Sequence, residues 1–394
     1  MSVPPNLSRL KTEENDDRLD PIGTSTRISA SQIIPQNVLL LIPVGSSSLP
    51  AVKSIEITPI DACNHDCGWC FTRDARSSRK ISTTALKAYL DEFIVGGGRS
   101  VTFSGGGEPL LFKPLLDEVA VFDDRSLLEY CLDRRLAVGL ITNGRGLRQM
   151  CLKLGQRITE LAFVRISLDA TNQVDHSKLH KTNVGDFKHI LCGIEELAAI
   201  RGSHSTTPAI GISFVVDSIA RINFEACSIT EIARLASRLG VDFAQLKHVH
   251  LNRAETAHAA MQIAHLRCQE ASAWGKSEYW VHHYLQPRPT IVCLVPTVGQ
   301  LIDAGGQRFP CCHLQSDDSF FEKENIAPIG TVVRGCKSSV CRYVSVNEVL
   351  TAVAKGIHAE ASHRHILRES ILRDGYHPYR LFPSAPDLFS PWSG

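Results

Sequence analysis

Strand-like and helix-like segments alternate along this chain from about residue 51, and this alternation restricts the possible folds more than any other feature. The strand-like segments are short and rich in β-branched residues, whereas the segments between them repeat apolar residues at helical spacing. We predict six strands, over 54–60, 101–104, 137–142, 163–169, 210–216 and 243–249. Because helices separate the strands, the sequence predicts an α/β fold built on parallel strands.

The first predicted strand leads into a loop that carries three cysteines, Cys63, Cys67 and Cys70. Iron–sulfur clusters are normally held by four cysteine thiolates, so this spacing predicts a [4Fe–4S] cluster with one open iron or a distant fourth ligand. An open iron can bind a small molecule. The loop leaves two alternatives, a zinc site that includes His65 and chance clustering of the cysteines.

The second predicted strand runs into a glycine turn that ends with Gly106, Gly107 and Glu108. Together with the three cysteines, and with Trp69 directly before the last of them, this turn resembles the radical S-adenosylmethionine (SAM) superfamily. The resemblance implies that the cysteine loop holds the cluster and that the turn binds the amino group of SAM. The chemistry agrees, since glycines let the backbone approach a ligand closely and a carboxylate suits an ammonium group.

Six βα units match the partial (β/α)6 TIM-like barrel that is usual in this family, with the site at the carboxyl ends of the strands. A polar residue near the end of the fourth strand, here Ser167, commonly contacts the ribose or carboxylate of SAM in the family. The resemblance therefore predicts these cofactor-binding residues: Trp69, Gly106, Gly107, Glu108, Asn143, Ser167 and Asp169.

Residue alternation predicts which side chains face the interior of the barrel. Arg165, Ser167 and Asp169 share one face of the fourth strand, and Gln245 and Lys247 share one face of the sixth. The apolar faces should pack on the helices, so these polar faces should line the lumen. Burying an unpaired cation is costly, so the two cations should have a partner, either the SAM carboxylate or a substrate. We take Arg165, Gln245 and Lys247 as candidate catalytic residues; the alternative is that they only fill the lumen.

A second group of cysteines follows residue 285. Cys293 is followed by twelve residues, Gly306, four residues and Cys311, which resembles the start of the SPASM and twitch auxiliary-cluster domains of radical SAM enzymes. The glycines before Cys311 also predict a β-hairpin. With Cys336 and Cys341, these cysteines would complete one auxiliary [4Fe–4S] cluster.

The second group departs from the full SPASM pattern, because no cysteine follows Cys341 and the last pair is more widely spaced. The shorter twitch form with one cluster therefore fits better. Cys312 is an alternative to Cys341 as the fourth ligand, and a zinc site is an alternative to the cluster.

The composition excludes several other classes of protein. A formal net charge of +1 gives no reason to expect nucleic acid or an anionic membrane as a partner. No apolar run is long enough to span a bilayer, and no signal peptide pattern is present. Thirteen cysteines without a secretion signal favour a reducing cytoplasm and metal–sulfur chemistry.

We expect four parts in the chain: an extension over 1–50, the barrel over 51–285, the twitch-like domain over 286–345, and a carboxyl-terminal helix and tail over 346–394. The family resemblance covers roughly residues 51–345.

The resemblance implies reductive cleavage of SAM, with electrons from a flavodoxin- or ferredoxin-type donor, and a 5′-deoxyadenosyl radical that removes hydrogen from a substrate. Because residues 1–50 leave little room for a peptide-binding domain, we expect a small polar natural product. Such a sugar, aminocyclitol or nucleoside would undergo oxidation, epimerisation or dehydration. The alternatives are a maturase that crosslinks or epimerises a ribosomal peptide and, in another class, a non-enzymatic iron–sulfur or zinc protein.

Overall fold

The computed structural model describes residues 54–70, 72–202, 208–215, 229–247, 280–283, 286–287, 292–297, 299–309, 311, 333–334, 340–341 and 347. The expected extension over 1–50, nearly all of the expected carboxyl-terminal part, Cys312 and Cys336 lie outside these residues. Cys341 is described only as part of a strand.

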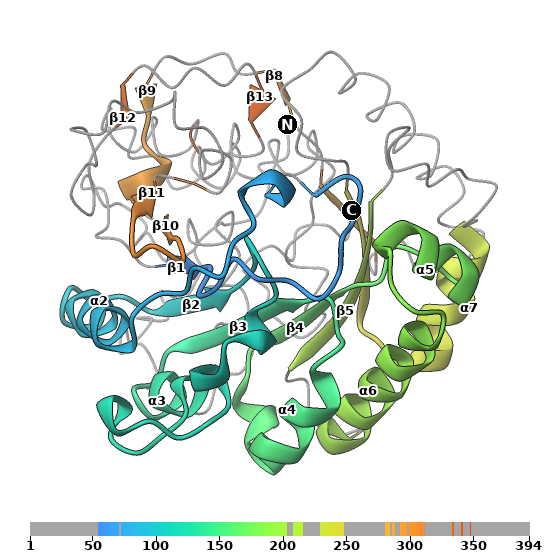
Figure 1. The fold of residues 1–394 in the computed structure, drawn as a ribbon, viewed down its shortest axis with the longest axis horizontal. Helices are drawn as coiled ribbons and strands as arrows, with labels where there is room; N and C mark the ends of the chain where they lie inside the picture. Colours follow the sequence, from blue (N-terminus) through green and yellow to red (C-terminus); the bar gives the residue numbers. More distant parts are fainter. Residues whose placement is uncertain are drawn as a thin grey trace, which may run out of the picture.

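Six parallel strands follow one another in chain order through the sheet, as the sequence predicts. They are β1 (Ser54–Ile57), β2 (Ser100–Phe103), β3 (Ala137–Thr142), β4 (Phe163–Ser167), β5 (Ala209–Val215) and β6 (Phe243–Lys247). Helices cover the outer side of this curved sheet (Figure 1). The α/β fold class and the partial, TIM-like arrangement are confirmed.

The helices connect these strands along the outside of the sheet. The α-helices are α2 (Thr83–Val95), α3 (Leu127–Asp133), α4 (Leu147–Leu154), α5 (Gln173–His180), α6 (Gly185–Arg201) and α7 (Ile229–Leu239). Short 3-10 helices are η2 (Arg73–Ala75), η3 (Pro109–Leu111), η4 (Lys113–Leu115), η5 (Ala120–Phe122), η6 (Gly155–Glu160) and η8 (Val295–Thr297). None of the described helices is long and apolar enough to cross a membrane.

Further strands extend the sheet at both edges, giving nine described strands in the order β11-β10-β1-β2-β3-β4-β5-β6-β7. β7 (Trp280–His283) runs parallel to β6, and β10 (Gly299–Ile302) runs parallel to β1. β10 and β11 (Arg308–Phe309) pair antiparallel, which confirms the predicted hairpin. Gly306 in its turn has a φ of +78°, a conformation that favours glycine. The hairpin is continuous with the barrel sheet.

Two small antiparallel pairs involve cysteines of the second group. β9 (Val292–Cys293) pairs with β12 (Val333–Arg334), and β8 (Gln286–Pro287) pairs with β13 (Val340–Cys341).

The core lies between the sheet and the helices. Val164 and Ile166 of β4 are buried in this core, whereas Arg165 and Ser167 alternate with them and do not belong to it. The predicted separation of an apolar outer face from a polar inner face is therefore confirmed for β4. Strand register places Ser167 beside Ser213 of β5, and Ser213 beside Gln245 of β6, so a polar row crosses three strands.

Candidate active site

The cysteine loop is held in place by the glycine turn. The backbone N–H of Gly107 donates to the Ile60 carbonyl at 3.0 Å, and that of Glu108 donates to the Ala62 carbonyl at 2.9 Å. A Cβ on Gly107 would lie 2.1 Å from the Ala62 oxygen, so only glycine allows this approach. The loop before Cys63 and the turn after β2 thus form one unit at the carboxyl ends of β1 and β2.

Each of the three thiols has a polar neighbour, and those of Cys70 and Cys63 come from the loop itself and from the end of β3. Cys70 Sγ lies 3.2 Å from Thr72 Oγ1, and this hydroxyl donates to the Gly106 carbonyl at 2.6 Å. The Asn143 amide nitrogen lies 3.9 Å from Cys63 Sγ. Burial raises the pKa of the Cys63 thiol to about 11, so it stays protonated at neutral pH unless a metal binds it. A metal ion deprotonates a thiol that coordinates it.

Glu108 is buried and already has protein donors. Its carboxylate accepts hydrogen bonds from the backbone N–H of Leu110 at 3.0 Å, the Thr142 hydroxyl at 2.6 Å and the backbone N–H of Asn143 at 2.7 Å. Burial raises the pKa of Glu108 to about 7, against the lowering effect of these hydrogen bonds. Glu108 thus connects the glycine turn to the end of β3.

Three buried histidines, His65, His176 and His180, form a cluster next to Cys67, and of these only His65 was a candidate ligand from the sequence, in the zinc alternative. His180 Nδ1 lies 3.2 Å from Cys67 Sγ and 3.1 Å from His65 Nδ1. The ring of His176 stacks on that of His180, with centroids 4.3 Å apart. The Trp69 ring packs edge-on against the His180 ring, with centroids 5.6 Å apart. The signal that could have shown this cluster is the spacing of His176 and His180, which places them on one face of a helix.

His180 carries the charge within this cluster. Its Nε2 lies 3.3 Å from Asp169 Oδ2, and both side chains are almost fully buried. Burial lowers the pKa of His180, but hydrogen bonds to Asp169 and Cys67 outweigh this effect and raise it to about 10. Burial lowers the pKa of His65 and of His176 to about 3, so both remain neutral.

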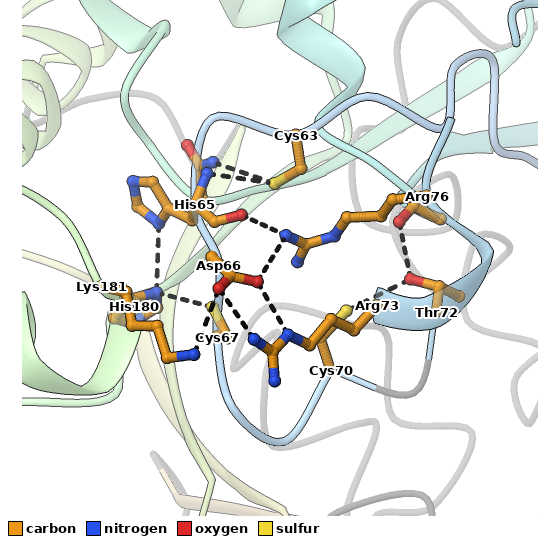
Figure 2. Close-up of polar contacts among 12 residues, drawn as sticks. Cys63, His65, Asp66, Cys67, Cys70, Thr72, Arg73, Arg76, His180 and Lys181 are labelled. Atoms are coloured by element: carbon orange, nitrogen blue, oxygen red, sulfur yellow. Dashed lines mark hydrogen bonds and ion pairs between the residues drawn. The ribbon is translucent and has the colours of Figure 1, made fainter. Parts of the chain in front are cut away.

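Charged side chains around Asp66 hold the cysteine loop together (Figure 2). Asp66 accepts two hydrogen bonds from Arg73, at 2.9 and 3.0 Å, and pairs with Lys181 at 3.2 Å. Arg76 donates to the His65 carbonyl at 2.5 Å. These contacts join the loop both to η2 and to the end of α5.

The inner wall of the sheet carries the predicted catalytic candidates. Gln245 and Ser213 are buried, and within the described structure neither Gln245 Oε1 nor Ser213 Oγ has a hydrogen-bond partner. Lys247 lies near enough to Asp169 to help lower the pKa of that carboxyl, against the opposing effect of burial. Arg165 and Lys247 are half-buried.

Asp169 lies apart from the alternating pattern of β4. The strand ends at Ser167, and the N–H groups of Leu168 and Asp169 both donate to the Ser213 carbonyl at 3.1 Å. Asp169 adopts a φ of 56°, and its carboxylate accepts from the Val215 N–H at 2.8 Å as well as facing His180. The backbone bend, rather than strand alternation, sets the direction of this side chain.

The structure describes two cysteines of the second group with their side chains. Cys293 and Cys311 are half-buried and form no disulfide. The auxiliary cluster stays a prediction. In the described part of the chain, His65, Cys67 and His180 also bring one donor atom each within 4.8 Å of one another, a grouping that corresponds to the zinc alternative.

Comparison with known proteins places this site in a family. The model of the radical SAM superfamily matches residues 57–218. The fold is similar to that of SuiB from Streptococcus suis, bound to the precursor peptide SuiA, with a TM-score of 0.52 and 12% identity over 78% of this chain and 67% of SuiB. SuiB bound to S-adenosylmethionine gives a TM-score of 0.51 and 12% identity, over 78% and 68% of the two chains.

A third solved structure, anSMEcpe with bound AdoMet and a Cp18Cys peptide, gives a TM-score of 0.45 and 16% identity over 66% of this chain and 74% of that one. The search of curated proteins found no match. The matched residues include the cysteine loop, the glycine turn and the first strands of the barrel, and residues 57–218 therefore form a domain of the radical SAM superfamily.

Proposed function

We propose that this chain cleaves SAM reductively at a [4Fe–4S] cluster held by Cys63, Cys67 and Cys70, and that its substrate is a small polar molecule bound in the lumen of the barrel. The observation that carries the proposal is the cysteine loop at the carboxyl ends of the strands, fixed to the glycine turn by two backbone hydrogen bonds.

The chemistry of the loop fits the cluster. Three half-buried thiols lie on one short loop and none forms a disulfide, so all three can coordinate iron as thiolates. Cys63, Cys67 and Cys70 would hold the cluster, which would pass the electron from an external donor to SAM and so allow its cleavage to methionine and a 5′-deoxyadenosyl radical. The protein orients SAM and the substrate and excludes water.

Glu108 is proposed to meet the amino group of SAM. A carboxylate has about four acceptor positions, and three are occupied by Leu110, Thr142 and Asn143. One position on Oε2 is left for the ammonium. Glu108→Gln removes the charge, so SAM affinity should fall about tenfold or more in equilibrium dialysis with unchanged iron content, because charge-assisted hydrogen bonds are worth roughly 1.5–3 kcal/mol. Equal affinity would remove Glu108 from the SAM site.

The lumen favours a ligand with several hydroxyl groups. Gln245 Oε1 and Ser213 Oγ are buried without a described hydrogen-bond partner, and an unsatisfied buried polar group is costly unless a ligand or water pairs with it. We propose Arg165, Gln245 and Lys247 as substrate-contacting residues, with Trp69, Asn143, Ser167 and the glycine turn nearer SAM. The twitch-like auxiliary cluster on Cys293, Cys311, Cys336 and Cys341, and a flavodoxin- or ferredoxin-type donor, belong to the same proposal.

A peptide substrate is the second candidate. It is favoured by the likeness in fold to SuiB, which was solved with a precursor peptide. The two candidates differ in the source of the hydrogen that the radical removes.

Isotope transfer separates the two candidates. The reconstituted protein would be incubated with SAM and, in turn, with a perdeuterated sugar, aminocyclitol, nucleoside or unstructured peptide. Deuterium in 5′-deoxyadenosine from one of the first three probes is expected. Transfer from the peptide alone would contradict the small-molecule proposal. A chain that binds zinc and forms no 5′-deoxyadenosine would be a non-enzymatic metal protein.

A further inference from the structure

A buried row of side chains leads from Asp169 through His180 to Cys67. His180 is the last residue of α5, and it comes within hydrogen-bond distance of a thiol that we assign to the cluster. Only 1% of the His180 side chain and 3% of the Asp169 side chain are exposed, so water does not compete for the contact between these two side chains.

The contacts of His180 define where its hydrogens lie. Nε2 faces two acceptors, the Leu168 carbonyl and Asp169 Oδ2, each at 3.3 Å, so Nε2 must carry a hydrogen. Nδ1 faces Cys67 Sγ at 3.2 Å and His65 Nδ1 at 3.1 Å. A cysteine that coordinates iron is a thiolate and can only accept, so an attractive contact requires that Nδ1 donates.

The surroundings hold the imidazole in this orientation. Asp169 is itself fixed, because its Oδ1 accepts the Val215 N–H at 2.8 Å. His176 stacks on one face of the His180 ring at 4.3 Å, and its own nitrogens have no described hydrogen-bond partner. The ring therefore has a fixed direction, with His176 acting by packing alone.

We propose that His180, oriented by Asp169, donates a hydrogen bond from Nδ1 to the sulfur of Cys67 and thereby raises the reduction potential of the cluster. The inference rests on the proposed function, since it requires a cluster on this loop. Hydrogen bonds to cluster sulfurs and partners behind the ligands are known to tune the potential of metal centres. His180 is in this account a positioning and tuning residue, not a catalytic one.

The test compares two side chains of equal size at this position. His180→Asn keeps an N–H donor near the place of Nδ1, whereas His180→Leu has none. His176→Phe is the matched control, because it keeps a ring in the stack and removes no described hydrogen bond. Each protein would be reconstituted anaerobically, its iron counted, and its cluster titrated against redox mediators with detection by electron paramagnetic resonance.

We expect His180→Leu to lower the ratio of reduced to oxidised cluster about tenfold at a fixed potential, which is 59 mV for one electron. His180→Asn should have a reduction potential close to that of the wild type, because it keeps the donor. His176→Phe should have the same potential as the wild type. Equal potentials in the wild type and His180→Leu would overturn the inference. So would equal shifts in His180→Leu and His180→Asn.

If His180→Leu holds no iron, His180→Met takes its place, because methionine also lacks an N–H donor and leaves Asp169 unchanged. A lower potential in His180→Met is then expected, and an unchanged potential would overturn the inference. If the wild type binds no cluster at all, the proposed function fails instead, so the two failures are distinguishable.

Discussion

The backbone N–H of Asp66 donates a 2.9 Å hydrogen bond to the carbonyl oxygen of His180. This bond places the middle of the cysteine loop on the carboxyl end of α5, where the last carbonyls of a helix have no partner within the helix. Lys181, the next residue, adopts the left-handed conformation with a φ of 50° and also pairs with Asp66. The end of α5 therefore helps to shape the loop.

Lys181→Gly should be neutral or stabilising. Glycine adopts the left-handed conformation at a helix end without steric cost, and the exposed ion pair that is lost contributes little. We expect the free energy of unfolding to stay equal or rise by up to about 1 kcal/mol, measured by chemical denaturation, because relief of the left-handed strain offsets the added freedom of glycine in the unfolded chain. Lys181→Val should lower it, because a β-branched residue is strained at positive φ. The reverse order of the two variants would contradict this description of the helix end.

Gly107→Ala should damage the loop. The new Cβ would lie 2.1 Å from the Ala62 carbonyl oxygen, so the backbone that precedes Cys63 must shift. We expect a loss of iron binding and a fall in stability of roughly 1–3 kcal/mol. Gly68→Ala is the control in the same loop, because a Cβ there would meet no atom within 4 Å. Equal iron content in the two variants would show that close packing against the turn does not matter.

Glu108 should make stability depend on pH. Its pKa is raised from 4.5 to about 7 in the folded protein, so between these values the folded state holds a proton that the unfolded state has lost. Its contribution is therefore most favourable below about pH 4.5 and declines as the pH rises to about 7. The decline should be about 3 kcal/mol, at 1.36 kcal/mol per pKa unit.

Glu108→Gln resembles the protonated acid and should remove this decline. The measurement is the difference in unfolding free energy between wild type and variant from pH 5 to pH 8. A difference that does not change with pH would mean that Glu108 titrates as an exposed carboxyl does.

The second group of cysteines predicts a second, fully ligated cluster. Wild type should then hold about eight irons per chain, and substitution of Cys63, Cys67 and Cys70 by alanine should leave about four. Adding either Cys341→Ala or Cys312→Ala to this triple variant would identify the fourth ligand, because only the loss of a true ligand should remove the remaining iron. Complete loss of iron from the triple variant, or zinc in place of iron, would contradict the auxiliary cluster.

The sequence predicted the features that depend on local pattern. Alternation of strands and helices gave the parallel sheet, and the alternation within β4 separated Arg165 and Ser167 from the apolar core. Asp169 is an exception, because β4 ends two residues before it. It follows the same alternation in the sequence, but two hydrogen bonds to the Ser213 carbonyl bend the chain and turn Asp169 toward His180.

The sequence pattern could not predict contacts between residues that lie far apart in the chain. The pairing of β10 with β1 joins residues that lie far apart in the chain, and no periodicity specifies such a partner. The position of His180 beside Cys67 depends on how α5 packs against the loop after β1. His176 and His180 are four residues apart on α5 and share one face of it, but spacing alone does not show which loop that face meets.

If Cys63, Cys67 and Cys70 support reductive cleavage of SAM, the yield of 5′-deoxyadenosine should depend directly on these three residues. Anaerobically reconstituted wild type and the triple alanine variant would be reduced with dithionite and incubated with SAM under the same conditions. We predict 5′-deoxyadenosine from the wild type and none above background from the variant. Equal yields from the two proteins would contradict the assignment of this loop as the site of SAM cleavage.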